Sequence, residues 1–117
     1  MGFQQPKSYN VLLCGDSCQD VYHYGMCERI SPEAPVPVFK EYSQKTKVGM
    51  SSNVRLNLES FGIIVDHYTS REITKKHRFI DQRYNQHILR WDEGEKELVR
   101  EMDIGAPSPR ILEKYDA

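Results

Sequence analysis

Strand-like patterns dominate the first part of the chain. Residues 9–14 form a short apolar run that stops at Gly15, which predicts a buried strand. The polar residues 15–20 predict a loop at the carboxyl end of that strand. Residues 21–25 are aromatic and favour a second strand. Three prolines within residues 28–40 predict an extended connector or edge strand, because proline cannot donate a hydrogen bond to a sheet ladder.

An amphipathic helix is predicted near the middle of the chain, after a polar stretch at residues 41–47 that is typical of an exposed strand or turn. Ser51 or Ser52 is the expected N-cap, and Gly62 is expected to end the helix. Apolar side chains at positions i, i+4 and i+7 are expected to face the core: Val54, Leu58 and Phe61.

The second half of the chain continues with strands and short helices. The pattern predicts strands over residues 63–68, 73–81 and 87–92, a turn at 82–86, helices over 93–102 and 110–115, and a break at 105–109. This order of elements indicates an α/β or α+β chain. The strands at residues 21–40 and 73–92 have too few helices to cover both of their faces. We therefore expect a small sheet that packs against something else, such as a second copy of the chain.

Composition limits the chain to one modest domain. It has 117 residues, of which 38% are hydrophobic. The 16 basic and 17 acidic residues give a net charge of −1, which excludes a generic basic surface for nucleic acid or anionic membranes. No apolar run approaches the roughly 20 residues that span a bilayer, and residues 1–10 lack the pattern of a signal peptide. We expect a soluble, cytoplasmic protein.

The three cysteines, Cys14, Cys18 and Cys27, match neither a disulfide framework nor a zinc site with paired cysteines. Cys14 ends an apolar run and is expected to be a buried thiol. Cys18 and Cys27 can be reactive only where they are partly exposed beside positive charge. No metal site is predicted.

Two motifs near the start of the chain occur in a recognisable order. Gly15 and Asp16 follow the first strand, with Asp20 shortly after them, and residues 29–38 read Arg-Ile-Ser-Pro-Glu-Ala-Pro-Val-Pro-Val. Together they resemble the ribokinase-like (PfkB) carbohydrate kinases, and most closely the heptose-7-phosphate kinase branch.

Later motifs extend this resemblance over about residues 10–92. Residues 49–54 are similar to the family's Gly-Gly-x-x-Asn-Val sugar motif, and residues 76–80 and 89–92 to its Lys-x-Arg and Leu-Arg-x-Asp strands. The resemblance implies that residues 1–117 form one truncated ribokinase-like domain. Its small β-sheet lid would comprise strands over about 21–47 and 73–92.

A sugar phosphate presents many hydroxyl groups and one dianion, so its site needs directed carboxylates and amides and at least one guanidinium. The resemblance, with this chemistry, gives six candidate sugar-binding residues: Asp16, Asp20, Gly49, Asn53, Arg78 and Arg90. Asp16 is the residue that the resemblance assigns most firmly to the sugar, and the two arginines are the phosphate candidates. Each candidate also has an ordinary structural interpretation as a turn cap, a helix-terminus residue or a surface ion pair. The four histidines have no clear acid–base partner in the sequence.

The chain also departs from the family pattern. Met50 stands where the motif has its second glycine, and only a few residues separate Tyr68 from Ile73, where the family has a large α/β stretch. The family's Gly-Ala-Gly-Asp-type loop, which carries the catalytic base, and its ATP pocket would follow the last residue of this sequence, and no Walker-type loop replaces them. No catalytic residue is assigned, and ATP and Mg²⁺ are expected only if another chain completes the site.

Three hypotheses follow from these patterns. The first is a protein that binds a sugar, a sugar phosphate or a partner and forms a homodimer through the lid sheet, without independent phosphoryl transfer. The second is an active or split ATP-dependent sugar kinase of the heptose-phosphate type, completed by another chain. The third is a regulatory module that pairs with a full-length kinase.

Overall fold

The computed structural model of the chain describes residues 2, 7–69, 73–94 and 108–117. Their elements are β1 (Asn10–Cys14), β2 (Ser17–Ile30), β3 (Pro37–Met50), α1 (Ser51–Ser60), β4 (Ile64–Tyr68), β5 (Thr74–Asp81), β6 (Gln86–Glu93) and α3 (Pro109–Leu112). The helix predicted over residues 93–102 lies largely outside the described residues. In the described part of the chain, no helix is long and apolar enough to cross a membrane.

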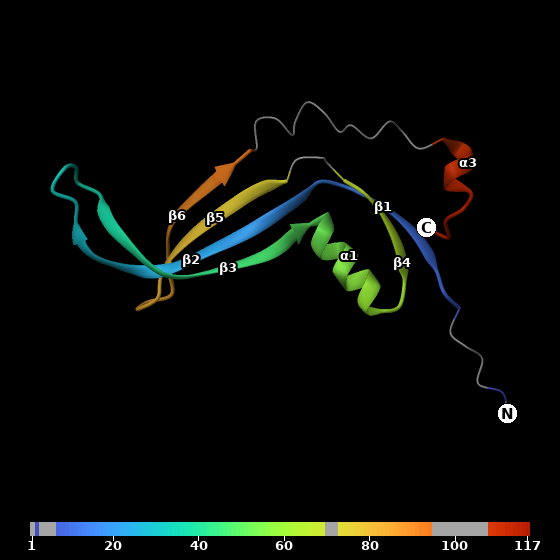
Figure 1. Cartoon of the computed structure of the whole chain (residues 1–117), viewed down its shortest axis with the longest axis horizontal. Coiled ribbons are helices and arrows are strands. Elements are labelled where there is room, and N and C mark those ends of the chain that lie inside the picture. Colours follow the sequence, from blue (N-terminus) through green and yellow to red (C-terminus); the bar gives the residue numbers. More distant parts are fainter. Residues whose placement is uncertain (1, 3–6, 70–72, 95–107) are drawn as a thin grey trace.

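The strands form two sheets toward opposite ends of the molecule (Figure 1). β1 and β4 pair in parallel, and α1 lies in the connection between them. The other sheet, which we call the lid sheet, has the order β3-β2-β5-β6. Its central pair, β2 and β5, is parallel, whereas the β2–β3 and β5–β6 pairs are antiparallel. The mixed α/β class that the sequence predicted is confirmed.

The link between β1 and β2 is shorter than the sequence predicted. The expected loop over residues 15–20 is wrong, since only Gly15 and Asp16 lie between the two strands. Ser17 pairs with Met50 and Asp20 with Lys47, so these polar residues continue the ladder instead of leaving it. Long-range pairing overrides their weak local preference for strand.

The proline-rich residues 29–38 form the end of the β2–β3 hairpin. Ser31 N donates to the carbonyl oxygen of Val36 at 2.8 Å, and Glu33 N donates to the Ser31 hydroxyl at 3.2 Å. Pro37 is the first residue of β3, an edge strand of the lid sheet, where the missing N–H is tolerated. The extended connector is thus a tight hairpin end.

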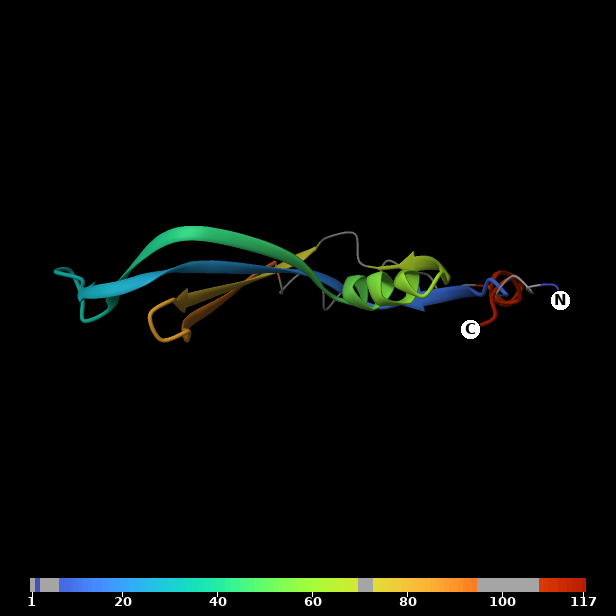
Figure 2. The ribbon, with the colours of Figure 1, turned by 90° about the horizontal axis from the view of Figure 1, so that it is seen from below.

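The molecule is long and flat. Its principal extents are 69, 44 and 15 Å and its radius of gyration is 20.4 Å, against about 13 Å for a compact domain of this length. Figure 2 shows this thinness edge-on. Among the described residues, the buried hydrophobic side chains are those of Cys18, Val21 and Val65. The fold is essentially one layer thick.

Two predictions about burial are wrong for this reason. In the expected core-facing stripe of α1, Val54 is 44% exposed and Phe61 is 81% exposed. Cys14, expected to be buried, is exposed as well. No second layer of described residues covers these side chains, so an apolar pattern that is typical of a core is left open to solvent.

Residues near the end of the sequence pack against the two-stranded sheet. Asp116 N donates to the carbonyl oxygen of Asn10 at 2.7 Å, and Leu12 N donates to the carbonyl oxygen of Ala117 at 2.9 Å. The Tyr115 hydroxyl donates to Asp66 Oδ2 at 2.6 Å, and this hydrogen bond raises the pKa of Tyr115 to about 12. β1 is therefore hydrogen-bonded on both of its edges.

Asp81, at the end of β5, ties the β5–β6 turn to β2. Its carboxylate accepts hydrogen bonds from Cys27 N at 3.2 Å, from Arg83 N at 3.0 Å and from the Arg83 guanidinium at 3.1 Å. The side chain is 4% exposed in a sheet with little apolar burial. The hydrogen bond from Arg83 is the main reason why the pKa of Asp81 falls from 3.8 to about 2.

We expect Asp81→Asn to lower the thermal unfolding midpoint at pH 7. Because the folded pKa is depressed, the stability contributed by Asp81 is present above pH 3.8 and is lost as pH falls through about 2. The variant should therefore lose part of the acid-induced destabilisation in that window. Thermal melts followed by circular dichroism at several pH values measure this, with Glu33→Gln at the exposed hairpin end as the control. An acid limb identical to that of the wild type would contradict the assignment.

Candidate functional site

Asp16 lies in the short link between β1 and β2, beside the amino end of α1. Ser51 N donates to the carbonyl oxygen of Asp16 at 3.0 Å, and Ser51 Oγ lies 2.7 Å from that oxygen and 2.8 Å from the carbonyl oxygen of Gly15. The Asp16 carboxylate oxygen Oδ1 is buried and has no hydrogen-bond partner among the described residues. A buried acceptor without a donor is costly, so this oxygen has an unmet hydrogen-bonding capacity.

A cluster of hydroxyl groups holds the same corner. Ser17 Oγ lies 2.6 Å from Thr69 Oγ1, 2.7 Å from Ser52 Oγ and 3.1 Å from Ser51 Oγ. The cluster joins the start of β2, the first turn of α1 and the residue that follows β4. It fixes the backbone on either side of Asp16.

His67 on β4 joins this cluster through Ser51. Its Nε2 lies 2.8 Å from Ser51 Oγ, and burial lowers the pKa of the imidazole, with the positive charge of Arg55 adding to the effect. The neutral ring that results can accept from or donate to the Ser51 hydroxyl.

The start of α1 differs from the sequence prediction. Ser51 or Ser52 was expected as the N-cap, but Met50 holds that position and the helix has no side-chain cap. Ser51 lies inside the first turn because its hydroxyl binds the carbonyl groups of the β1–β2 link. Asn53 is in the same turn and is exposed, and its carbonyl oxygen accepts from Asn57 Nδ2 at 3.0 Å.

Met50 adopts φ 54° and ψ −134°, a left-handed backbone conformation that favours glycine. This is the position at which the similar sugar-site motif has its second glycine. The backbone has therefore kept a glycine-like conformation although the residue is methionine. The Met50 side chain is 46% exposed and gains little from packing.

Gly49 makes room for two side chains of β2. A Cβ atom at this position would lie 2.6 Å from both Asp20 Oδ2 and Cys18 Sγ. Cys18 is 2% exposed, and burial followed by the charge of Asp20 raises the pKa of its thiol. Cys18 is therefore a protonated packing residue, and it does not meet the condition for a reactive cysteine.

Asp20, Arg78 and Arg90 lie on one face of the lid sheet. The strand register places this set together, and we call it the polar face: Asp20, Tyr22, Lys47, Lys76, Arg78, Arg90 and Asp92. Arg78 Nη1 donates to Asp20 Oδ1 at 2.5 Å, and its guanidinium lies over the Tyr22 ring at 5.4 Å. Arg90 donates to both oxygens of Asp92, at 2.8 and 3.0 Å.

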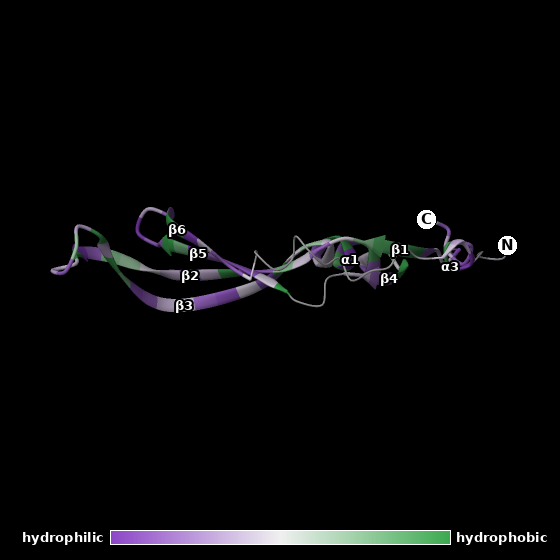
Figure 3. Cartoon of the chain, turned by 90° about the horizontal axis from the view of Figure 1, so that it is seen from above, coloured by the Kyte–Doolittle hydropathy of each residue, from purple (hydrophilic) through white to green (hydrophobic). Residues whose placement is uncertain are grey.

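The polar face is rich in positive charge. Lys47 also lies over the Tyr22 ring, at 5.7 Å, on the side of β3, and Lys76 is opposite Asp20 in the β2–β5 register. Figure 3 shows hydrophilic residues along much of β3 and hydrophobic residues in β1. The paired guanidiniums are held in place, and the neighbouring lysines leave a surplus of cationic groups for an anionic ligand.

The structure thus brings the six candidate residues together in two adjacent groups. Asp16 and Asn53 lie at the β1–α1 corner, while Asp20, Gly49, Arg78 and Arg90 lie along the lid sheet that begins there. Sequence reasoning missed the hydroxyl cluster and Tyr22. Adjacent serines at the start of a helix indicate a cap, and nothing in the sequence shows that they bind a distant backbone.

The opposite face of the lid sheet is aromatic. We define this aromatic face by its ring-bearing residues: His23, Phe39, His77, Phe79 and Trp91. His23 stacks on Phe79 with ring centres 4.4 Å apart, and His77 stacks on Trp91 at 4.5 Å. Trp91 is 50% exposed.

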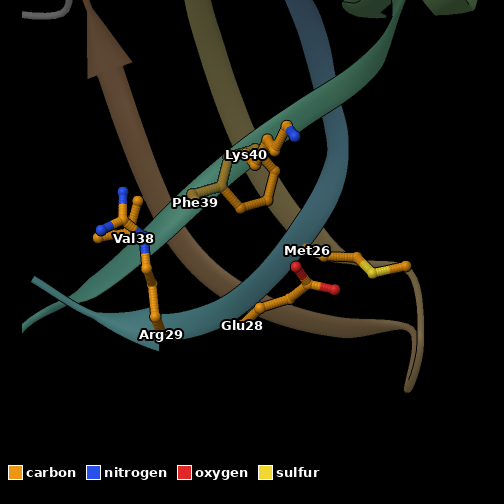
Figure 4. Close-up of a pocket in the computed structure, with 6 residues that line it drawn as sticks. All are labelled: Met26, Glu28, Arg29, Val38, Phe39 and Lys40. Carbon is orange, nitrogen blue, oxygen red and sulfur yellow. The ribbon is translucent and has the colours of Figure 1, made fainter.

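A shallow pocket of about 220 Å³ lies at the far end of the β2–β3 hairpin, lined by Met26, Glu28, Arg29, Val38, Phe39 and Lys40 (Figure 4). Register shifts in β2 and β3 bend the hairpin at this point. None of the six candidate residues lines this pocket, so it is not part of the predicted site. No three His, Cys, Asp or Glu side chains among the described residues are placed to hold a metal ion.

Comparisons with known proteins find similar sequences over part of the chain. It is 48% identical over 56 residues to the bifunctional protein HldE of Methylococcus capsulatus, which is 48% of this chain and 12% of that protein. The HldE proteins of Proteus mirabilis and Haemophilus influenzae are 49% identical over 53 residues and 41% identical over 59 residues, and the chain covers 11% and 12% of them. No family model matches the chain.

Among solved structures, a carbohydrate kinase from Agrobacterium tumefaciens superposes with a TM-score of 0.40 and 11% sequence identity, over 73% of this chain and 35% of that one. The chain spans about one eighth of the length of the curated relatives it matches. The predicted resemblance to the heptose-7-phosphate kinase branch is confirmed over this partial stretch.

The backbone at Met50 leads to a test. We expect Met50→Gly to raise the free energy of unfolding by about 1 kcal/mol, because relief of left-handed strain outweighs the added freedom of the unfolded chain. Urea denaturation measures the change. Met50→Ala is the matched control: it removes the same side chain but retains Cβ and therefore the strain. A glycine variant no more stable than the alanine variant would contradict a strain at φ 54° that outweighs this added freedom.

Proposed function

We propose that this chain binds a sugar or sugar phosphate with the residues of the β1–α1 corner and the polar face, and pairs with a second copy through the aromatic face. In this proposal it supplies the sugar side of a carbohydrate-kinase-like site and does not transfer a phosphoryl group by itself. The buried, unpartnered Oδ1 of Asp16 is the observation that carries the proposal.

Asp16 supports sugar binding through its position and its unmet hydrogen-bonding capacity. The backbone of Asp16 is held by Ser51, so the carboxylate has a defined direction before any ligand arrives. A sugar hydroxyl is a donor of the right size and neutral charge for a carboxylate oxygen that the described protein groups leave unpaired. Preorganisation of this kind lowers the entropy that binding costs.

The polar face supports recognition of a phosphate in addition to hydroxyl groups. Arg78 is oriented by Asp20 on one side and by the Tyr22 ring on the other, which keeps its remaining N–H groups in a fixed plane. Lys47 and Lys76 add positive charge beside it. A dianion on the sugar would meet this cationic surface while the hydroxyl groups meet Asp16.

Phosphoryl transfer depends on positioned metal ions, a base and donors that stabilise the transferred group. The proposal is binding without independent catalysis, with ATP and Mg²⁺ entering only if another polypeptide contributes their site.

The flat shape supports the proposed homodimer. A single layer 15 Å thick exposes both faces of the lid sheet, whereas stable domains pack at least two layers. Stacking two copies through their aromatic faces would cover Phe79, Trp91 and their neighbours and leave both polar faces free for sugar. In this proposal the partner is a second copy, and the same strip of rings is buried on both sides of a twofold axis.

Calorimetric titration with a heptose 7-phosphate tests sugar binding. We expect saturable heat with the wild type and at least a tenfold loss of affinity in Asp16→Asn, because the amide replaces one acceptor oxygen and one negative charge. Asp66→Asn, on the exposed part of β4, is the control and should bind as the wild type does. A parallel titration with a non-hydrolysable ATP analogue should give no heat.

The outcomes separate the alternatives. Binding of the nucleotide analogue by the chain alone would contradict the absence of independent catalysis and favour a complete kinase site. The absence of binding heat with both ligands would contradict the sugar site. In that case, a folded protein that co-purifies with a full-length kinase would favour the regulatory module.

Sedimentation equilibrium tests the dimer. We expect the wild type to self-associate at micromolar concentration and Trp91→Ala to weaken association at least tenfold, because the indole is the largest exposed side chain of the aromatic face. Phe61→Ala removes an exposed ring just after α1, away from the lid sheet, and is the control. A stable monomer at high micromolar concentration, or equal weakening in both variants, would contradict association through this face.

A further inference from the structure

A line of four hydrogen-bonding side chains crosses the aromatic face, one from each strand of the lid sheet. Glu41 on β3 bonds to Nδ1 of His23 on β2. Nε2 of His23 lies 2.8 Å from Nδ1 of His77 on β5, and Nε2 of His77 lies 2.9 Å from Oε2 of Glu93 on β6. We call this arrangement the Glu–His–His–Glu line. It uses every ring nitrogen of both histidines.

The two imidazole rings are fixed in their orientation by the stack around them. His23 stacks on Phe79 with ring centres 4.4 Å apart, and His77 stacks on Trp91 with ring centres 4.5 Å apart. The side chains of His23 and His77 are only 13% and 10% exposed. Neither ring can turn to find a different partner without breaking this stack.

Counting protons along the line shows that it is one proton short. Its three contacts each need one proton between two acceptor atoms. Two neutral imidazoles carry one N–H each, so two protons serve three contacts when both glutamates are ionised. One additional proton satisfies every contact. A second additional proton would leave N–H groups of both His23 and His77 pointing at each other. The line therefore binds one additional proton favourably and a second one unfavourably.

The surrounding charges direct that proton to an imidazole. Lys75 lies opposite Glu93 in the β5–β6 register, and the hydrogen bond from His77 together with Lys75 lowers the pKa of Glu93. Glu93 thus stays ionised near neutral pH. Asp81, further along β5 on this face, is neutralised by Arg83. The residue opposite His23 on β3 is the uncharged Gln44.

Covering the aromatic face raises the free-energy cost of leaving the Glu–His–His–Glu line one proton short. Glu41 and Glu93 are 44% and 47% exposed, so water now solvates both carboxylates. A second copy on this face would remove that water. Burying two carboxylates beside an unsatisfied contact is costly, whereas one bound proton halves the net charge and completes the hydrogen bonds.

We propose that each chain takes up one proton on the Glu–His–His–Glu line when a second copy covers the aromatic face, so that dimerisation is favoured by mildly acidic pH and opposed by alkaline pH. This inference rests on the dimer proposed above and adds its regulation. Two protons are bound per dimer, so association should weaken by up to about 100-fold for each unit by which the pH rises.

Sedimentation equilibrium between about pH 6 and pH 8.5 at constant ionic strength measures this, and Glu93→Gln is the deciding variant. The amide that this substitution introduces donates to Nε2 of His77, so three contacts have three protons while both imidazoles stay neutral. Glu93→Gln should therefore associate at pH 8 about as tightly as the wild type does at pH 6, with little further dependence on pH. Glu59→Gln makes the same change on α1 and should retain the pH dependence of the wild type.

Each outcome decides the matter. A steep dependence on pH in the wild type that Glu93→Gln removes and Glu59→Gln keeps would support the proposal. The other two histidines, His67 and His87, are present in all three proteins, so a dependence that survives in Glu93→Gln would assign it to them and overturn the proposal. Dimers of equal affinity at every pH would overturn this inference alone, and monomers at every pH would overturn the dimer as well.

Discussion

The hydrogen bonds from Ser51 to the carbonyl groups of Gly15 and Asp16 hold the two sheets of this molecule together. β2 leaves β1 after only two residues, and β3 returns to the same place before it becomes α1. Both strands of the long hairpin therefore meet at one corner, where Ser17 pairs with Met50. Without the Ser51 contacts, the lid sheet would be joined to β1, β4 and α1 only by chain connections and a few side-chain bonds. The direction of the Asp16 carboxylate depends on the same contacts.

The two faces of the lid sheet differ because side chains of a strand alternate with a period of two. Along β2, Asp20 and Tyr22 face the guanidinium of Arg78, whereas Val21 and His23 face the aromatic side. In a domain of ordinary thickness one of these faces would be covered by the rest of the core. Here a single layer leaves both open, and the polar side chains of each face pair in a different way. On the polar face they form ion pairs supported by Tyr22, and on the aromatic face they share the Glu–His–His–Glu line, which is one proton short.

Local patterns in the sequence were sufficient to predict most strands, the helix and its end at Gly62, which has a φ of 77°. Local patterns failed wherever a residue's structure is determined by a partner that is far away in the sequence. The start of β2 depends on residues 47–50, which no window around Ser17 contains. The apolar stripe of α1 predicted a core that the described residues do not provide. His23 showed no acid–base partner in the sequence because its partners, Glu41 and His77, are 18 and 54 residues away.

The candidate site shows the same contrast between what local motifs predict and what long-range packing determines. The resemblance to carbohydrate kinases names Asp16 and Asn53 as candidates, since short motifs carry residue identity, and their role in binding stays a prediction. It could not predict that Asp16 Oδ1 is buried without a partner among the described residues, because burial depends on how the corner is packed. Nor could it predict that Arg78 is already bound by Asp20, a pairing that parallel strands far apart in the sequence create.

The corner also explains how the backbone keeps its shape although Met50 replaces a glycine of the similar motif. A non-glycine residue in a left-handed conformation costs about 1–3 kcal/mol. Each net hydrogen bond contributes about 1 kcal/mol, and the corner has several that a glycine–alanine sequence would lack, from Ser51, Ser52 and Ser17. The two magnitudes are comparable, so the serines can offset the strain. A methionine in the motif is thereby compatible with the left-handed backbone conformation that this position adopts beside Asp16.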